Sequence, residues 1–226
     1  MRGNPVHFEF LIEDQSGKKA LETLVPKIIG DGHSFNIHAY KGIGRIPRKL
    51  GTGSDAGKRI LLDQLPRLLR GHGKTFAGYS GSYPAAVILV CDLDKRCLAG
   101  FRKELFDILH ACDPKPETRF CIAIEEGEAW FLGDIPAIKK AYPKAKDNVL
   151  NGYENDSVCG TWELLADAVF PGGSPALKAD GWQAIGAEKS VWSEKISPHM
   201  TINENRSPSF RYFVAKLHEL ALKKRM

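Results

Sequence analysis

The sequence has no apolar stretch of the roughly 18–20 residues that a membrane span needs, and it contains no internal repeat or low-complexity tract. Residues 1–5 lead directly into a strand-like pattern, without an apolar signal core and small-residue cleavage site. We therefore expect a cytoplasmic protein with no membrane-bound part. A chain of 226 residues can build one substantial core and does not require two domains.

Cysteine is scarce, and its spacing excludes two common uses. The five cysteines are odd in number and form no CxxC pair, so neither a disulfide framework nor a zinc ribbon is supported. The metalloprotease pattern HExxH and the P-loop pattern GxxxxGK[ST] are both absent. Residues 80–82 (SGS) lack the context of a nucleophile elbow, which leaves acyl transfer without support. Carboxylates and cations remain as the candidates for chemistry.

Positive charge is concentrated in one part of the chain. Residues 41–74 contain nine Lys or Arg and two Asp, a local net charge of +7 against +5 for the whole chain. A segregated basic block is typical of a polyanion-binding face, although a solvated helix face is an equally weighted alternative. A glycine-rich loop at 42–45 could also wrap phosphate with its backbone N–H groups. The candidate phosphate-binding cations are Lys41, Arg45, Arg48, Lys49, Lys58 and Arg59.

Hydrophobic periodicity predicts alternating strands and helices. The expected strands are 6–13, 35–40, 85–92 and 119–124, and the expected helices are 17–29 with Ser16 as N-cap, 55–70, 98–112 and 207–224. This alternation indicates an α/β fold with an open, mostly parallel sheet flanked by helices. We expect an α/β core at residues 1–134 and a helical C-terminal extension at 135–226, packed on the core.

Acidic residues stand at the carboxyl ends of three of these strands. In an open α/β sheet, ligands gather in the crevice outside those ends, and neighbouring strands lie only about 5 Å apart. Carboxylates that converge there repel one another, and a hard cation such as Mg²⁺ or Mn²⁺ relieves the repulsion. Solvated loop carboxylates are the alternative reading. The acids are Glu13, then Asp92 and Asp94, then Glu125, Glu126 and Glu128.

Several motifs carry a resemblance to a known fold. They are FLIEDQSG (10–17), YKGIGR (40–45), DLD (92–94), IAIEEGEAW (122–130), CGTWE (159–163) and NRSPSF (205–210). The order of a glutamate, a DxD pair and a further acid resembles the TOPRIM fold of primases, topoisomerases and OLD-type nucleases. Over roughly the whole chain, the sequence more closely resembles a bacterial TOPRIM-like family, domain of unknown function 4276.

The resemblance implies roles for individual residues. Glu13 would act as general acid/base or metal ligand, Asp92 and Asp94 would hold Mg²⁺ or Mn²⁺, and Glu128 would complete the catalytic set. Glu125 is a further candidate metal ligand. TOPRIM nucleases often carry a second acid four residues after the first glutamate, where this chain has Gly17. This departure puts a second metal, and with it two-metal phosphodiester cleavage, in doubt.

Three functions follow as expectations. The first is a Mg²⁺-dependent nuclease acting on DNA or RNA in a bacterial defence system. The second is a non-catalytic TOPRIM-like module that binds nucleic acid or a partner, and the resemblance implies an ATPase partner for both. The third is another phosphoryl-transfer enzyme acting on a nucleotide. Haloacid-dehalogenase-type phosphatases also use a DxD pair, but they favour Thr or Val where this chain has Arg96.

Overall fold

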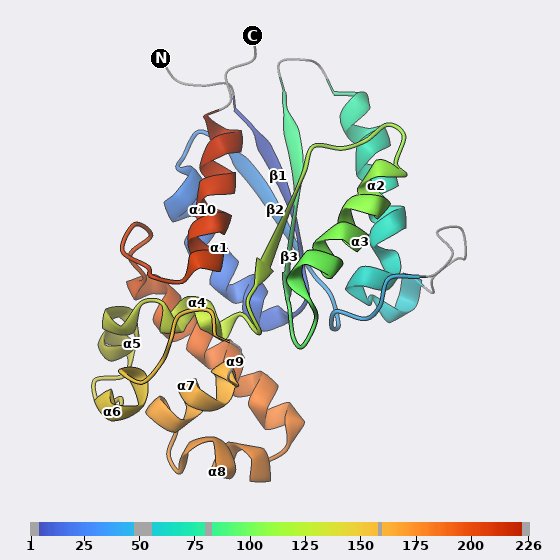
Figure 1. The fold of residues 1–226 in the computed structure, drawn as a ribbon. Helices are drawn as coiled ribbons and strands as arrows, with labels where there is room; N and C mark the ends of the chain where they lie inside the picture. The colour runs from blue at the N-terminus through green and yellow to red at the C-terminus, as the bar shows by residue number, and fades with distance from the viewer. Residues whose placement is uncertain (1–4, 48–55, 80–82, 158–159, 223–226) are drawn as a thin grey trace.

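The fold is built around a four-stranded sheet in which every strand runs parallel to its neighbours. A computed structural model describes residues 5–47, 56–79, 83–157 and 160–222. The strands are β1 (His7–Ile12), β2 (Ser34–Ala39), β3 (Ala85–Asp92) and β4 (Thr118–Ala123), in the order β2-β1-β3-β4 (Figure 1). The prediction of an open parallel α/β sheet is therefore confirmed.

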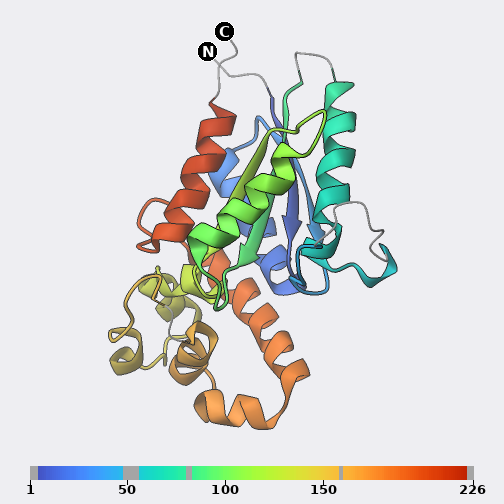
Figure 2. The same cartoon turned by 45° about the vertical axis from the view of Figure 1, so that its right-hand side comes forward.

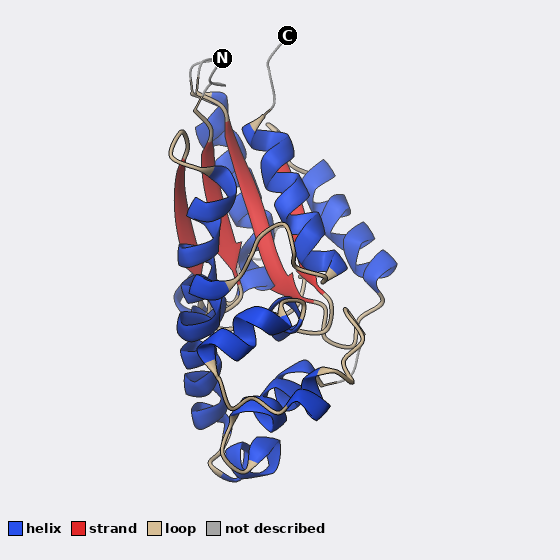
Figure 3. Cartoon of the chain, turned by 90° about the vertical axis from the view of Figure 1, so that its left-hand side faces the viewer, coloured by secondary structure: helices blue, strands red, loops and turns tan. Residues whose placement is uncertain are grey.

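Both faces of the sheet are covered because its central strands are apolar on both sides. Along β3, Ile88 and Val90 pack into one hydrophobic cluster, whereas Leu89 and Cys91 pack into the other. Helices α1 (Gln15–Ile29) and α10 (Pro208–Ala221) cover the first face, and α2 (Leu61–Ala77) and α3 (Leu98–His110) cover the second (Figures 1 and 3). The last helix of the chain thus completes the layer begun by the first.

Apart from the 3₁₀ helix η1 (Ala56–Lys58), which precedes α2, the remaining described helices lie beyond the carboxyl edge of the sheet (Figure 2). They are α4 (Glu128–Leu132), α5 (Ile135–Ala141), α6 (Asp147–Leu150), α7 (Thr161–Val169), α8 (Gly173–Ala179), α9 (Trp182–Ile196) and the 3₁₀ helix η2 (Ser197–His199). Helix α9 packs along α1 and shares its hydrophobic cluster. The expected helical C-terminal region is present. Within the described parts of the chain, no helix has the length and apolar character needed to cross a membrane.

Two local predictions are wrong in detail. Asp14, and not Ser16, caps α1: its Oδ1 accepts the N–H of Gly17 at 2.8 Å, and Ser16 donates its hydroxyl to Asp14 instead. Helix α2 begins at Leu61 and continues to Ala77, whereas the sequence predicts residues 55–70, of which residue 55 lies outside the described parts. The start is set by hydrogen bonds from the N–H groups of Leu61 and Leu62 to the loop carbonyls of residues 42 and 43.

Two glycines of α2 provide a matched test of how closely this helix approaches the loop at residue 114. Gly73 is buried, and an added Cβ would overlap the carbonyl oxygen of Pro114, whereas a Cβ at Gly71 would meet nothing. We expect Gly71→Ala to stabilise the protein by about 0.5–1 kcal/mol, because alanine loses less conformational entropy in a helix. Gly73→Ala should instead destabilise it by about 1–3 kcal/mol through overpacking. Urea unfolding measures both, and equal effects would contradict this close helix–loop approach.

Candidate active site

The acidic edge of the sheet coincides with a topological switch point. From β1 the chain passes through α1 to β2 on one side, and it then crosses through α2 to β3 on the other side of β1. In doubly wound sheets, the crevice between the carboxyl ends of two such strands is the usual place for a ligand. Glu13 follows β1 directly and Asp92 ends β3, so the topology itself brings these two acids to the crevice.

Three of the four predicted catalytic residues lie together at this point. The backbone N–H of Asp92 donates to Oε2 of Glu13 at 3.3 Å. Glu13, Asp92 and Glu128 line one cavity of about 50 Å³, with Gly17 and Lys189 on its wall. Such a volume holds only a few water molecules or a small ion. Glu128 itself, at the start of α4, is almost fully buried.

Lys189 is a member of this site that sequence reasoning missed. It projects from α9, and its Nζ lies 3.1 Å from Oε2 of Glu128 and 3.3 Å from Oε2 of Glu126. Its side chain is only 16% exposed, so the ammonium is a largely buried counter-ion. No motif or spacing in the sequence marks Lys189, because its role arises only when α9 packs along α1 and reaches the sheet edge.

Burial and crowding perturb the acids of the site. Burial, with added repulsion from Asp14 and Asp94, raises the pKa of Glu13 to about 7, despite the hydrogen bond from Asp92. Burial and the charge of Glu13 also raise the pKa of Asp92 well above its usual value, and burial raises the pKa of Glu126 to about 7. Burial disfavours the Lys189 ammonium, but the surrounding carboxylates outweigh this and raise its pKa. Strongly shifted groups in a crevice are typical of functional sites.

Asp94 lies beside this cavity rather than in it. The chain turns sharply after β3, with a φ of 51° at Asp94. Asp94 lines a wider groove of about 660 Å³ together with Arg45 and Arg96. The Arg96 guanidinium donates to Oδ2 of Asp94 at 3.2 Å and to the carbonyl of Gly44 at 3.3 Å, so it ties the DxD turn to the glycine-rich loop. The lining of this groove combines three cations with four carboxylates, namely Arg45, Lys95, Arg96, Asp94, Glu104, Glu125 and Glu126.

Glu125 has a structural task in addition to any chemical one. Its two carboxylate oxygens accept the N–H groups of Gly160 at 2.7 Å and Thr161 at 2.8 Å. Thr161 is the first residue of α7, where backbone N–H groups have no partner within the helix. Glu125 therefore caps α7 from a distance in sequence. Its predicted role as a metal ligand stays a prediction.

The glycine-rich loop could bind a phosphate with its side-chain cations, whereas two of its backbone N–H groups are already bonded within the protein. The N–H of Gly42 donates to the carbonyl of Glu13, and the N–H of Arg45 donates to Asp63, so neither is directed at a ligand. Gly44 has a φ of 68°, and a Cβ there would overlap Ile60, which accounts for the glycine. Among the predicted cations, Lys41, Arg45 and Lys58 are exposed, Arg59 donates to the carbonyl of Ala39, and Arg48 and Lys49 lie outside the described residues.

The carboxylates of the site suit a hard divalent cation, but their side chains are not arranged as a complete set of ligands for one. Carboxylate oxygens are the ligands that Mg²⁺ and Mn²⁺ prefer, and a bound cation would offset the burial that raises the pKa values of Glu13 and Asp92. Across the part of the chain that the structure describes, however, no three His, Cys, Asp or Glu side chains are arranged as a ready ligand set. The Lys189 ammonium supplies the positive charge between Glu126 and Glu128 instead.

Comparisons with models of protein families, with curated proteins and with solved structures give no match.

The shifted carboxyl of Glu13 predicts a pH-dependent stability. Its pKa rises from an ordinary 4.5 to about 7 on folding, so folding favours the protonated form. This contribution is fully present below pH 4.5 and is lost as the pH rises through 7. Between these values, the free energy of unfolding of the wild type should fall relative to that of Glu13→Gln, by up to about 3 kcal/mol.

Urea unfolding of both proteins at several pH values measures this difference. Glu22→Gln is the matched control, because Glu22 is an exposed carboxylate on the neighbouring helix α1. The free energy of unfolding of Glu22→Gln should change with pH in the same way as that of the wild type. If the free energy of unfolding of Glu13→Gln also changes with pH as that of the wild type does, the surroundings of Glu13 do not favour its protonated form.

Proposed function

We propose that the chain is a TOPRIM-like nuclease that hydrolyses phosphodiester bonds of DNA or RNA with Mg²⁺ or Mn²⁺, and that it acts in the cytoplasm. The observation that carries this proposal is the contact between Glu13 and Asp92 at the switch point, with raised pKa values for both. The adjoining groove contains the guanidinium groups of Arg45 and Arg96, which a phosphate can bind beside the acids.

Each residue of the site would have a distinct role in hydrolysis. A general base is most effective when its pKa lies near the working pH, and Glu13, at about 7, meets that condition for taking a proton from water. Arg45 and Arg96 would hold the substrate phosphate in the groove. A divalent ion held by Asp92, with Glu128 nearby, would supply several kcal/mol of charge stabilisation. Asp94 orients Arg96 through their ion pair.

Lys189 supports a version of the reaction with one metal ion. Gly17 borders the cavity at the position where related nucleases often carry a second acid, and Lys189 brings a positive charge to the same cavity. Fewer carboxylates and an added ammonium reduce the need for a second cation there. Lys189 would then stabilise the acids before the metal ion binds and contribute positive charge near the phosphate afterwards.

A non-catalytic binding module is the second candidate. It is favoured by Gly17 and by the position of Lys189, which already neutralises part of the acidic site. Restoring an acid at position 17 would also need a shift of the Ile12 side chain, because an added Cβ would lie 2.6 Å from its Cδ1. In either case we propose, from the family resemblance, an ATPase-containing partner and a role in bacterial defence. Catalytic activity decides between the two candidates.

Replacing Asp92 tests the nuclease. Asp92→Asn keeps the shape but removes the charge at the centre of the site, so cleavage should be abolished while the fold is retained. Asp107→Asn on the exposed face of α3 is the matched control and should cleave normally, since surface changes stay within about 0.5 kcal/mol of stability. The assay follows labelled single- and double-stranded DNA and RNA with Mg²⁺ or Mn²⁺, with and without an ATPase partner. Activity that survives Asp92→Asn would place the chemistry elsewhere.

Replacing Lys189 tests the competition between ammonium and metal ion. Lys189→Met leaves Glu126 and Glu128 without their cation, so at pH 8 it should destabilise the protein by about 3 kcal/mol. Mg²⁺ should then raise the melting temperature of Lys189→Met more than that of the wild type, since binding to the native state stabilises it. Lys19→Met is the control, because Lys19 on α1 forms an exposed ion pair with Glu194, which lies on α9 as Lys189 does. Equal responses to Mg²⁺ would show that Lys189 does not oppose metal binding.

A further inference from the structure

The two edge strands of the sheet differ, and β4 is the one that is closed. Arg102 of α3 donates to the hydroxyl of Tyr212 of α10 at 3.4 Å, and its guanidinium lies 5.4 Å from the centre of that ring. Helices α3 and α10 cover opposite faces of the sheet, so this contact passes across the edge of β4, where Ile122 lines the same groove. Another strand could pair with β4 only after this contact is broken.

The other edge strand, β2, has β1 and α1 as its neighbours (Figure 3). Along β2, alternate residues bond to the strand beside it, beginning with the N–H of Ser34, which donates to the carbonyl of residue 6 at 3.1 Å. The residues between them, Phe35 and Ile37, therefore direct their N–H and C=O groups outward. Within the described parts of the chain, these groups have no hydrogen-bond partner. Such a row of unpaired groups is a template for another strand.

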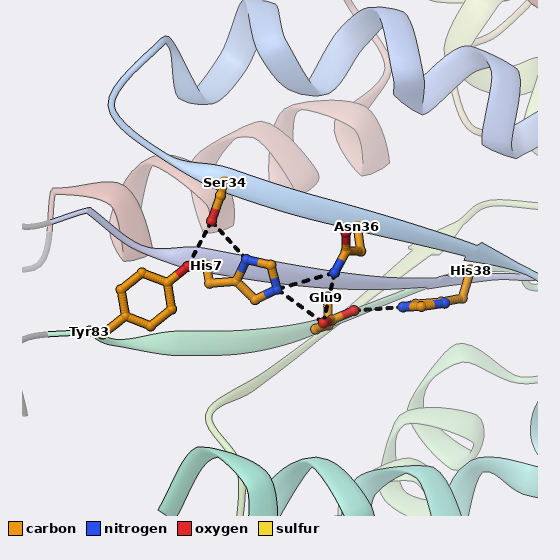
Figure 4. Close-up of polar contacts among 6 residues, drawn as sticks. All are labelled: His7, Glu9, Ser34, Asn36, His38 and Tyr83. Carbon is orange, nitrogen blue, oxygen red and sulfur yellow. Dashed lines mark hydrogen bonds and ion pairs between the residues drawn. The ribbon is translucent and has the colours of Figure 1, made fainter. Parts of the chain in front are cut away.

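The sequence of β2 lacks the features that keep a strand edge from pairing. Charged residues and proline are common protection, and the six residues of β2 include no Pro, Gly, Lys, Arg, Asp or Glu. Its polar side chains lean towards β1 and not across the edge (Figure 4). His38 lies 2.6 Å from Oε2 of Glu9, and Asn36 donates to Oε1 of Glu9 at 3.1 Å. The Ser34 hydroxyl lies 2.7 Å from Nδ1 of His7, so the outward backbone is left uncovered by all three.

This strand complements a second copy of itself in one antiparallel register. If Asn36 faces its counterpart across a two-fold axis, Phe35 of each chain faces Ile37 of the other. Opposite residues of this kind exchange both backbone hydrogen bonds, and pairs of an aromatic and a β-branched side chain are favourable. A register shifted by two residues would pair Phe35 with Ala39, whose carbonyl already accepts from Arg59 at 2.8 Å.

Opposite charges flank β2 at equal distances from the same centre. Asp31 precedes Asn36 by five residues and Lys41 follows it by five, and both are exposed just outside the strand. Neither forms an ion pair with another described residue of its own chain. In the register centred on Asn36, Asp31 of each chain comes opposite Lys41 of the other, which favours this pairing. A register shifted by two residues in either direction would move these charges apart.

We propose that β2 joins two copies of this chain into a symmetric dimer with one continuous sheet. A second copy is the occupant of the open edge because the backbone, the apolar pairs and the flanking charges are all self-complementary, as an isologous two-fold interface requires. Antiparallel pairing turns the acidic edges of the two sheets in opposite directions. The dimer therefore leaves both acidic sites open, and it does not depend on the proposed nuclease function.

Sedimentation velocity of the full chain over a range of concentrations tests the dimer. Asp31→Lys and Lys41→Asp each place like charges on facing positions, so each should weaken dimerisation of its own chain by about tenfold or more. A mixture of the two variants should form a heterodimer about as readily as the wild type dimerises, because every facing pair then joins opposite charges. Asp107→Lys reverses an exposed charge on α3 and should dimerise like the wild type.

The exchange of charges keeps the proposal open to contradiction even if one variant is poorly folded, which thermal melts detect. Carrying Asp31→Lys and Lys41→Asp in one chain should restore the dimer, since the facing pairs are again opposite in sign. A wild type that stays monomeric at its highest soluble concentration would overturn the proposal. So would unchanged dimerisation in both single variants, or single variants that dissociate but do not recover when they are mixed.

Discussion

A single buried ammonium connects the two halves of this protein. Lys189 belongs to α9, which packs along α1. Its ammonium forms ion pairs with Glu126 and Glu128, which follow β4 in the chain. An unpaired charge at such a place would be costly, so α9 and the acidic edge stabilise each other. The same ion pairs reduce the repulsion around Asp92. The site therefore depends on the helical region as much as on the sheet.

The sheet and its acidic edge could be predicted because both follow from local patterns. Continuous apolar runs identify buried parallel strands, and residues just beyond them must lie at one edge. Glu13 and Asp92 come together for this reason. Two features could not be predicted in this way: the ion pairs of Lys189 and the capping of α7 by Glu125. Each joins segments that are distant in sequence, and their geometry depends on how the helices pack.

Asp14 shows how one side chain limits the chemistry of another. The residue after Glu13 is acidic, yet its Oδ1 is bound to the N–H of Gly17 as the cap of α1. A cap contributes about 1 kcal/mol, so this oxygen is held at the helix end, although Asp14 also lines the cavity. Asp14 therefore acts on Glu13 through its charge alone and raises the pKa of that carboxyl. Four carboxylate residues therefore line the cavity, Glu13, Asp14, Asp92 and Glu128, and Lys189 lines it as their counter-ion.

Helix α2 is fixed to its neighbours near both of its ends. Its first turn is joined to the glycine-rich loop by backbone hydrogen bonds, and its second half packs closely against the loop at residue 114. Gly73 lets the helix approach residue 114 closely, so a shift of α2 would be resisted along its length. The glycine-rich loop, which carries Arg45 beside the groove, is therefore held in place by the packing of α2 against the rest of the protein.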